Sequence, residues 1–146
     1  MSNPEDFKAD RSRWRTDGPW WEEPDRKDWE HEGFTCMAKR HRHNGNWCGY
    51  VGVPPGHPWH GKDYGEVDAE VHGSLTYANE CQGDICHTPK PGEPEHLWWL
   101  GFDCAHAYDA SPVDDELMSW DATYRTLQYV QHETESLARQ ANEAKR

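Results

Sequence analysis

The chain has 146 residues and carries 27 acidic side chains against 15 lysines and arginines, a formal net charge of −12. This length predicts one domain with tails, and the negative field excludes duplex DNA or RNA as a partner, because it repels phosphate backbones. Hydrophobic residues make up only 34% of the sequence, but nine tryptophans supply the large apolar area that a core needs.

Most of the negative charge lies in the middle of the chain. Residues 47–119 contain thirteen acidic side chains and only Lys62 and Lys90 as basic ones. Such a segment suits a cation, a metal ion or a basic protein surface. There is no run of about eighteen apolar residues and no hydrophobic stretch of signal-peptide type, so we expect a cytoplasmic protein with no membrane partner.

Residues 1–33 combine charged side chains with tryptophans, and two interpretations stay open for them. They form either a loosely ordered polar arm or an arm whose tryptophans dock on a neighbouring subunit or partner. Phe34–Lys39 predicts a first strand, and Asn44-Gly45 is a hairpin signal that leads into a second strand, Trp47–Val53. Prolines 54 and 55 end that strand, because proline cannot donate to a ladder.

The segment Val67–Tyr77 alternates apolar and polar residues, which predicts a strand with His72 on its polar face. A proline-rich loop follows, and Leu97–Phe102 is then a continuous apolar run. We expect this run to be a central strand covered on both faces, with Asp103 and His106 just beyond its end.

The last part of the chain predicts helical structure. Ser111-Pro112-Val113-Asp114 is typical of a helix start, and from Asp121 the pattern is helical. One apolar stripe is formed by Trp120, Tyr124, Leu127, Val130, Leu137 and Ala141.

The sequence therefore predicts an α+β fold, a small, mainly antiparallel sheet with the C-terminal amphipathic helix packed on one face. We divide the chain into an N-terminal arm (1–33), a β-rich core with the candidate site (34–110) and a C-terminal helical segment (111–146).

One constellation of candidate site residues is formed by His57, His72, His106 and Asp103. Metal binding and acid–base catalysis both need imidazoles held by strands and turns, with a carboxylate to orient them. The alternative is that each histidine makes ordinary turn or cross-strand hydrogen bonds. If the site instead binds a small molecule, its candidate residues are His57, Trp59, Tyr64, His72, Thr76, Asp103 and His106.

The cysteines form a second constellation. Their number is five, which is odd, and with no export signal it argues against a disulfide framework and for free thiols. Cys81, Cys86, His87 and Cys104 are candidate ligands of a structural zinc ion. The alternative is that these thiols bind no metal and are partly buried.

Three segments resemble a widespread family of small bacteriophage-encoded proteins. They are the Gly-Tyr-Val-Gly-Val-Pro…Gly-His-Pro run at 49–58, Val-His-Gly…Leu-Thr-Tyr at 71–77 and Trp-Leu-Gly-Phe-Asp-Cys-Ala-His at 99–106. A closing helix of the form Tyr-Arg…Tyr-Val…Glu…Leu-Ala, at 124–138, is similar as well. The resemblance covers about residues 47–140 and implies a phage accessory protein in the host-cell cytosol rather than a particular reaction.

Three functions stay open from the sequence. The first is a counter-defence or host-takeover protein that sequesters a host small molecule, such as a nucleotide-derived immune signal. The second is a hydrolase that uses zinc or another divalent metal on such a molecule. The third is an acidic inhibitor that covers a basic patch on a host defence enzyme. The partner is accordingly a small molecule or a host protein, and a homo-oligomer is open.

Overall fold

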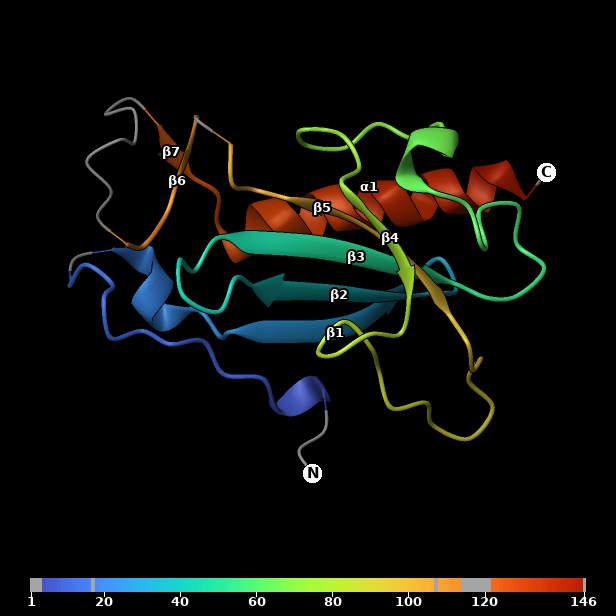
Figure 1. Ribbon diagram of the computed structural model, residues 1–146, viewed down its shortest axis with the longest axis horizontal. Coiled ribbons are helices and arrows are strands. Elements are labelled where there is room, and N and C mark those ends of the chain that lie inside the picture. Colours follow the sequence, from blue (N-terminus) through green and yellow to red (C-terminus); the bar gives the residue numbers. More distant parts are fainter. Residues whose placement is uncertain (1–3, 17, 107, 114–121, 146) are drawn as a thin grey trace.

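The structure is a computed structural model that describes residues 4–16, 18–106, 108–113 and 122–145. In chain order its elements are η1 (Pro4–Asp6), η2 (Pro19–Glu22), β1 (Arg26–His31), β2 (Phe34–Arg40), β3 (Trp47–Val53), η3 (Tyr64–Glu66), β4 (Tyr77–Glu80), β5 (Trp98–Asp103), β6 (Asp109–Ala110), β7 (Thr123–Tyr124) and α1 (Leu127–Ala144), where η marks a 3₁₀ helix. Helix α1 runs along the main sheet, and the β6–β7 pair lies near the start of that helix (Figure 1). No helix among the described residues has the length and apolar character needed to span a bilayer.

The main sheet has the order β1-β2-β3-β5-β4, and all neighbouring strands are antiparallel. The predicted hairpin is confirmed, because β2 pairs with β3 and Gly45 in their connection has a φ of +81°. The predicted central strand is also confirmed. β5 lies between β3 and β4, and Trp99, Leu100 and Phe102 are buried on its two faces.

Helix α1 covers one face of this sheet with a stripe of small and branched residues. Val130, Leu137, Ala138 and Ala141 are fully buried in the larger core cluster. Gly49 in β3 allows the close approach, because a Cβ atom there would collide with the Thr134 hydroxyl and the Phe102 ring. The predicted α+β class, with an antiparallel sheet and a C-terminal helix on one face, is confirmed.

The helix begins later than the sequence pattern predicts. Thr126 is its N-cap and accepts a hydrogen bond from the Tyr129 N–H (3.2 Å). The Glu23 carboxylate accepts a second one from the Leu127 N–H (2.6 Å). The prediction of helical structure from Asp121 is wrong for Thr123–Tyr124, because these residues form β7.

The helix start predicted at Ser111 is not found in the residues that the structure describes. Val113 instead forms an isolated antiparallel bridge with Trp14, and the Arg15 backbone N–H donates to Pro112 O. The rest of that prediction, residues 114–121 with Trp120, lies outside the described residues.

The N-terminal segment belongs to the domain more closely than an arm would. The sheet begins with β1, inside the range 1–33, and Trp14 and Trp20 are buried in the chain itself. Both tryptophans contact Arg40, which is fully buried. Arg40 donates hydrogen bonds to Trp20 O and to the Glu23 carboxylate, and its guanidinium lies against the Trp14 ring. A buried guanidinium needs such partners, and the N-terminal segment supplies them.

The predicted strand Val67–Tyr77 is wrong for most of its length, since β4 starts only at Tyr77. Gly73 and Ser74 have φ values of +67° and +70° and form a turn that interrupts any extended strand. The segment instead runs beside α1, where Gln140 bonds the backbone N–H and carbonyl of Glu70 (2.8 Å each). Gln140 of the helix thus forms the hydrogen bonds to the Glu70 backbone that a neighbouring strand would otherwise form.

The other face of the sheet carries a smaller core cluster of Met37, Tyr50, Leu97 and Trp99. Ile85 packs on it from the loop that follows β4. This loop contains a disulfide between Cys81 and Cys86, which corrects the expectation of free thiols. Cys36, Cys48 and Cys104 are free.

Candidate functional site

Three side chains from two parts of the chain converge near the start of α1. His72 precedes β4, His106 follows β5, and Asp109 lies in β6. One ring nitrogen of each histidine and a carboxylate oxygen of Asp109 all lie within 4.8 Å of one another. Among the described residues, this is the one group of three or more histidine, cysteine and acidic side chains with such spacing. We call it the His72–His106–Asp109 centre.

Asp109 is the middle of the centre. Its side chain is 0% exposed, and it accepts hydrogen bonds from His72 Nε2 (2.9 Å), His106 Nδ1 (2.8 Å), the His106 backbone N–H (3.1 Å) and Arg125 Nε (3.0 Å). Burial alone would raise the pKa of Asp109, but these hydrogen bonds outweigh it and hold the pKa below its ordinary value. Asp109 is therefore an ionised, fully engaged acceptor at neutral pH.

The second nitrogen of each imidazole also has a partner. His72 Nδ1 lies 2.8 Å from the Tyr129 hydroxyl, and His106 Nε2 lies 3.9 Å from a carboxylate oxygen of Asp103. The Thr76 hydroxyl in turn donates to Asp103 (3.0 Å). Such outer contacts fix the orientation of a histidine and decide which of its nitrogens faces inward.

The local backbone explains how His72 reaches the centre. The His72 N–H donates to the Glu133 carboxylate on α1 (2.8 Å). Gly73 follows with a positive φ, and its α-carbon lies so close to the His106 ring that a Cβ atom would overlap the ring. A side chain at position 73 is therefore disfavoured both by the backbone conformation and by the contact with the His106 ring.

Two further side chains complete the surroundings. The Tyr108 ring stacks on the His106 ring, with 5.1 Å between centroids and an interplanar angle of 5°, and is 49% exposed. The Arg125 guanidinium lies 4.9 Å from the centre of the Tyr129 ring. The centre thus has an aromatic wall, a cation and a partly solvent-exposed imidazole, His106.

This arrangement could hold a divalent metal ion. Two imidazoles and one carboxylate are the ligand set of several catalytic zinc and iron sites, in which further positions stay open for water or substrate. Arg125 donates to Asp109 Oδ1, whereas Oδ2 lies within hydrogen-bond distance of both imidazoles and also accepts from the His106 backbone N–H. Each imidazole nitrogen that donates to Asp109 would have to lose its proton to act as a ligand.

The structure brings together only part of the first predicted constellation. His72 and His106 form the centre, and Asp103 and Thr76 lie at its edge. His57 is elsewhere, because its Nε2 lies 2.8 Å from Ala141 O near the end of α1 and its Nδ1 accepts from the Trp59 N–H (2.9 Å). Burial lowers the pKa of His57, which fits a neutral ring with a packing role.

The predicted aromatic pocket residues do not gather around the centre either. Trp59 is buried in the larger core cluster beside His57. Tyr64 is 48% exposed in η3, and its backbone N–H is held by Asp63. The described residues therefore do not form a pocket between the Trp59 and Tyr64 rings.

The second predicted constellation, the structural zinc site, is corrected by the disulfide. Cys81 and Cys86 are bonded to each other and cannot act as thiolate ligands in this state. His87 packs edge-on against Trp99. Cys104 is buried at the end of β5, where burial raises the pKa of its thiol well above the ordinary value, which excludes a reactive thiolate.

Sequence reasoning missed Asp109, Arg125, Tyr129 and Glu133. A signal for the last three was present, because they recur at four-residue steps beside the apolar stripe of the helix. Asp109 follows His106 by three residues, which is the span of one turn, and the Asp109 N–H indeed donates to His106 O (2.9 Å).

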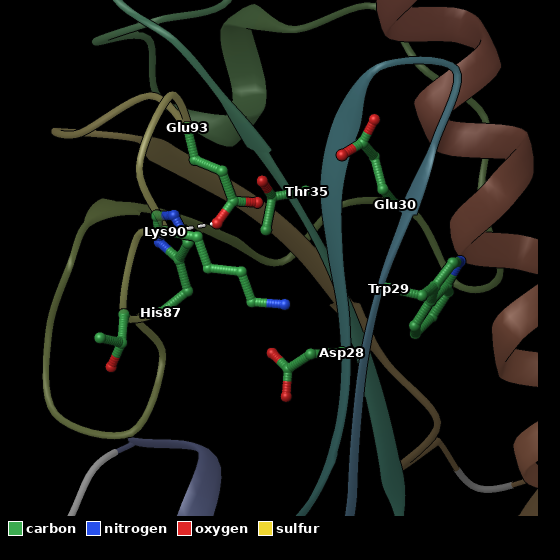
Figure 2. A pocket seen from close by; sticks show the side chains of 8 residues that line it. Asp28, Trp29, Glu30, Thr35, His87, Lys90 and Glu93 are labelled. Carbon is green, nitrogen blue, oxygen red and sulfur yellow. Dashed lines mark hydrogen bonds between the residues drawn. The ribbon is translucent and has the colours of Figure 1, made fainter.

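A separate cavity of about 300 Å³ lies on the face of the sheet opposite α1 (Figure 2). Its lining residues are Asp28, Trp29, Glu30, Thr35, His87, Thr88, Lys90 and Glu93. In Figure 2 the loop that carries Lys90 and Glu93 faces β1 and β2 across the cavity, and Glu93 accepts a hydrogen bond from the Lys90 N–H (2.7 Å). The cavity shares no residue with the His72–His106–Asp109 centre.

No protein-family model matches the chain, and no curated protein or solved structure matches it. The geometry of the centre therefore carries the functional argument alone.

Proposed function

We propose that the protein is a metal-dependent hydrolase whose ion is held by His72 Nε2, His106 Nδ1 and Asp109 Oδ2. One observation carries this proposal. Three ligand atoms from two segments lie within 4.8 Å of one another, while the outer nitrogen of each imidazole faces a further polar group, Tyr129 or Asp103. Binding of an ion would change the distances between these atoms.

The size of these movements can be estimated. Ligand atoms around a tetrahedral zinc ion lie about 3.3 Å apart, given bonds of about 2.0–2.1 Å. Asp109 Oδ2 is 2.9 Å from His72 Nε2 and 2.8 Å from His106 Nδ1. These two oxygen–nitrogen pairs must therefore spread by a few tenths of an ångström as the ion replaces the two imidazole protons.

The chemistry follows from the open coordination positions. With three protein ligands, a zinc ion held there would leave a position for water, whose pKa zinc lowers to about 7. An ion held there would supply the nucleophile for hydrolysis, and Asp103 beside His106 is placed to exchange a proton at the edge of the centre. The acidic segment 47–119 favours the cation over competing anions.

The first test combines metal binding with turnover. Metal-stripped protein is titrated with Zn²⁺ and Mn²⁺ by calorimetry, and hydrolysis of a chromogenic phosphate ester is followed in parallel. We expect one ion per chain and metal-dependent turnover, both lost in Asp109→Asn. His132→Ala, which removes an exposed histidine of α1, is the matched control and keeps both. Turnover that persists without metal, or equal metal binding by Asp109→Asn, contradicts the proposal.

The resemblance to phage proteins suggests where the substrate comes from. On this proposal the substrate is a host small molecule, and a nucleotide-derived signal is one such molecule. Binding without cleavage is the competing function. After incubation with a suspected ligand and heat denaturation of the protein, recovery of the intact ligand indicates sequestration, and its loss indicates hydrolysis.

A further inference from the structure

Arg125 is a cation fixed beside the His72–His106–Asp109 centre. Its Nε donates to Asp109 Oδ1 (3.0 Å), and its guanidinium lies over the Tyr129 ring at 4.9 Å. It directly precedes Thr126, the N-cap of α1. The side chain is 25% exposed. These contacts use one edge and one face of the guanidinium.

The remaining edge is available for a ligand. No described residue accepts a hydrogen bond from Arg125 Nη1 or Nη2. A guanidinium presents its N–H groups as a rigid planar fork, which matches two oxygens of a phosphoryl or carboxylate group. A fork with one nitrogen already fixed loses little freedom when it binds an anion.

The charge around the centre makes such a group necessary for an anionic substrate. Asp103 lies at one edge of the centre and Glu133 holds the His72 backbone at another, so a free anion is repelled from both sides. Arg125 is the one lysine or arginine among the described residues that forms an ion pair with Asp109. An anionic group can therefore approach the centre on the side where the Arg125 guanidinium lies.

We propose that Arg125 binds an anionic group of the substrate, a phosphoryl or carboxylate group, next to the metal ion. This inference rests on the proposed function and narrows its substrate to anionic molecules. Nε keeps Asp109 in place while the Nη atoms hold two oxygens of the substrate. Arg125 thus both contacts the substrate and positions the carboxylate ligand.

The test uses the zinc-loaded protein and two simple probes, inorganic phosphate and benzoate, in separate calorimetric titrations. Arg125→Gln removes the charge and the fork, and Arg139→Gln removes an exposed arginine that pairs with Glu143 on α1. We expect the better-bound probe to bind about tenfold more weakly, or weaker still, to Arg125→Gln, because a hydrogen-bonded charge is lost. Arg139→Gln should bind both probes as the unchanged protein does.

The outcomes separate this inference from the function on which it rests. A loss confined to phosphate assigns the site to phosphoryl groups, and a loss confined to benzoate assigns it to carboxylates. Unchanged affinity for both probes in a zinc-binding Arg125→Gln protein overturns the inference alone. No zinc binding by the unchanged protein overturns the proposed function instead. If Arg125→Gln itself loses zinc, Arg125→Lys keeps the charge without the fork, and the same weakening of the better-bound probe is expected there.

Discussion

The α-carbon of Gly73 lies against the imidazole of His106, in the space that any side chain at position 73 would need. The φ of Gly73 is +67°, so the same position also requires a backbone conformation that other residues adopt at a cost. This contact joins the loop before β4 to the loop after β5 and sets the distance between His72 and His106.

Gly73→Ala should therefore separate the two imidazoles. We expect a loss of about 1–3 kcal/mol of unfolding free energy from the backbone strain and a loss of metal affinity from displacement of the His106 ring. Chemical denaturation and calorimetric metal titration measure the two effects. Gly65→Ala is the matched control, because a Cβ atom at Gly65 meets nothing within 4 Å. Unchanged metal affinity in Gly73→Ala would show that the contact does not position His106.

The Asp109 carboxylate should make stability depend on pH. Its pKa is lowered in the folded state, so the stabilisation is present at pH values above the unfolded pKa of about 4 and is lost as the pH falls through the folded pKa. Asp109→Asn lacks this contribution. Unfolding free energies measured between pH 7 and pH 3 should therefore fall more steeply for the unchanged protein than for the variant. Parallel curves for the two proteins would contradict the assignment of Asp109 as the ionised acceptor.

Metal binding should stabilise the fold, because the ligands come from two segments, one with His72 and one with His106 and Asp109, that separate on unfolding. At an ion concentration one hundred times the dissociation constant, the gain is about 2.7 kcal/mol. The melting temperature should rise with Zn²⁺ concentration in the unchanged protein and stay constant in His106→Ala. An equal rise in both proteins would place the ion elsewhere.

Glu23 connects the N-terminal segment to the start of α1, and its loss should be costly. It accepts hydrogen bonds from the buried Arg40, the Tyr124 hydroxyl and the Leu127 N–H. Glu23→Ala leaves Arg40 without one of its two carboxylate partners, so we expect a loss of about 3 kcal/mol, measured by denaturant unfolding. Glu22→Ala, in the same segment but exposed, should change stability by about 0.5 kcal/mol or less. Similar values for both variants would refute the role of Glu23.

The disulfide should be independent of the metal centre. Cys81 and Cys86 are five positions apart, and removing the cross-link over so short a loop costs about 2 kcal/mol. The double variant Cys81→Ser/Cys86→Ser should have a lower free energy of unfolding, measured by denaturant unfolding. It should bind metal with unchanged stoichiometry, measured by calorimetric titration. Loss of the ion in this variant would show that the metal centre depends on the disulfide.

The sequence was sufficient where local patterns agree with the final packing. The Asn44-Gly45 turn, the apolar run that became β5 and the stripe from Val130 to Ala141 are each specified by neighbouring residues. It misled at Val67–Tyr77, because Gly73 and Ser74 turn the chain there and α1 replaces a strand as the hydrogen-bonding partner. The alternation of apolar and polar residues predicts neither this turn nor the packing of the segment against α1.

The candidate site was predicted in part for the same reason. His72 and His106 stand out as histidines next to glycine and at a strand end, but the residue that joins them, Asp109, is an ordinary acidic residue in a turn. Its importance arises only when β6 pairs with β7 and brings Arg125 to its side. His57 has similar neighbours in the sequence, yet it is used to hold the end of α1.

Native mass spectrometry of the metal-stripped protein after addition of one equivalent of Zn²⁺ tests the central claim most directly. The account predicts one ion per chain for the unchanged protein and for His132→Ala, and none for Asp109→Asn or His106→Ala at the same concentration. An ion retained by Asp109→Asn and His106→Ala alike, or no ion on the unchanged protein, would contradict the claim that the His72–His106–Asp109 centre binds metal.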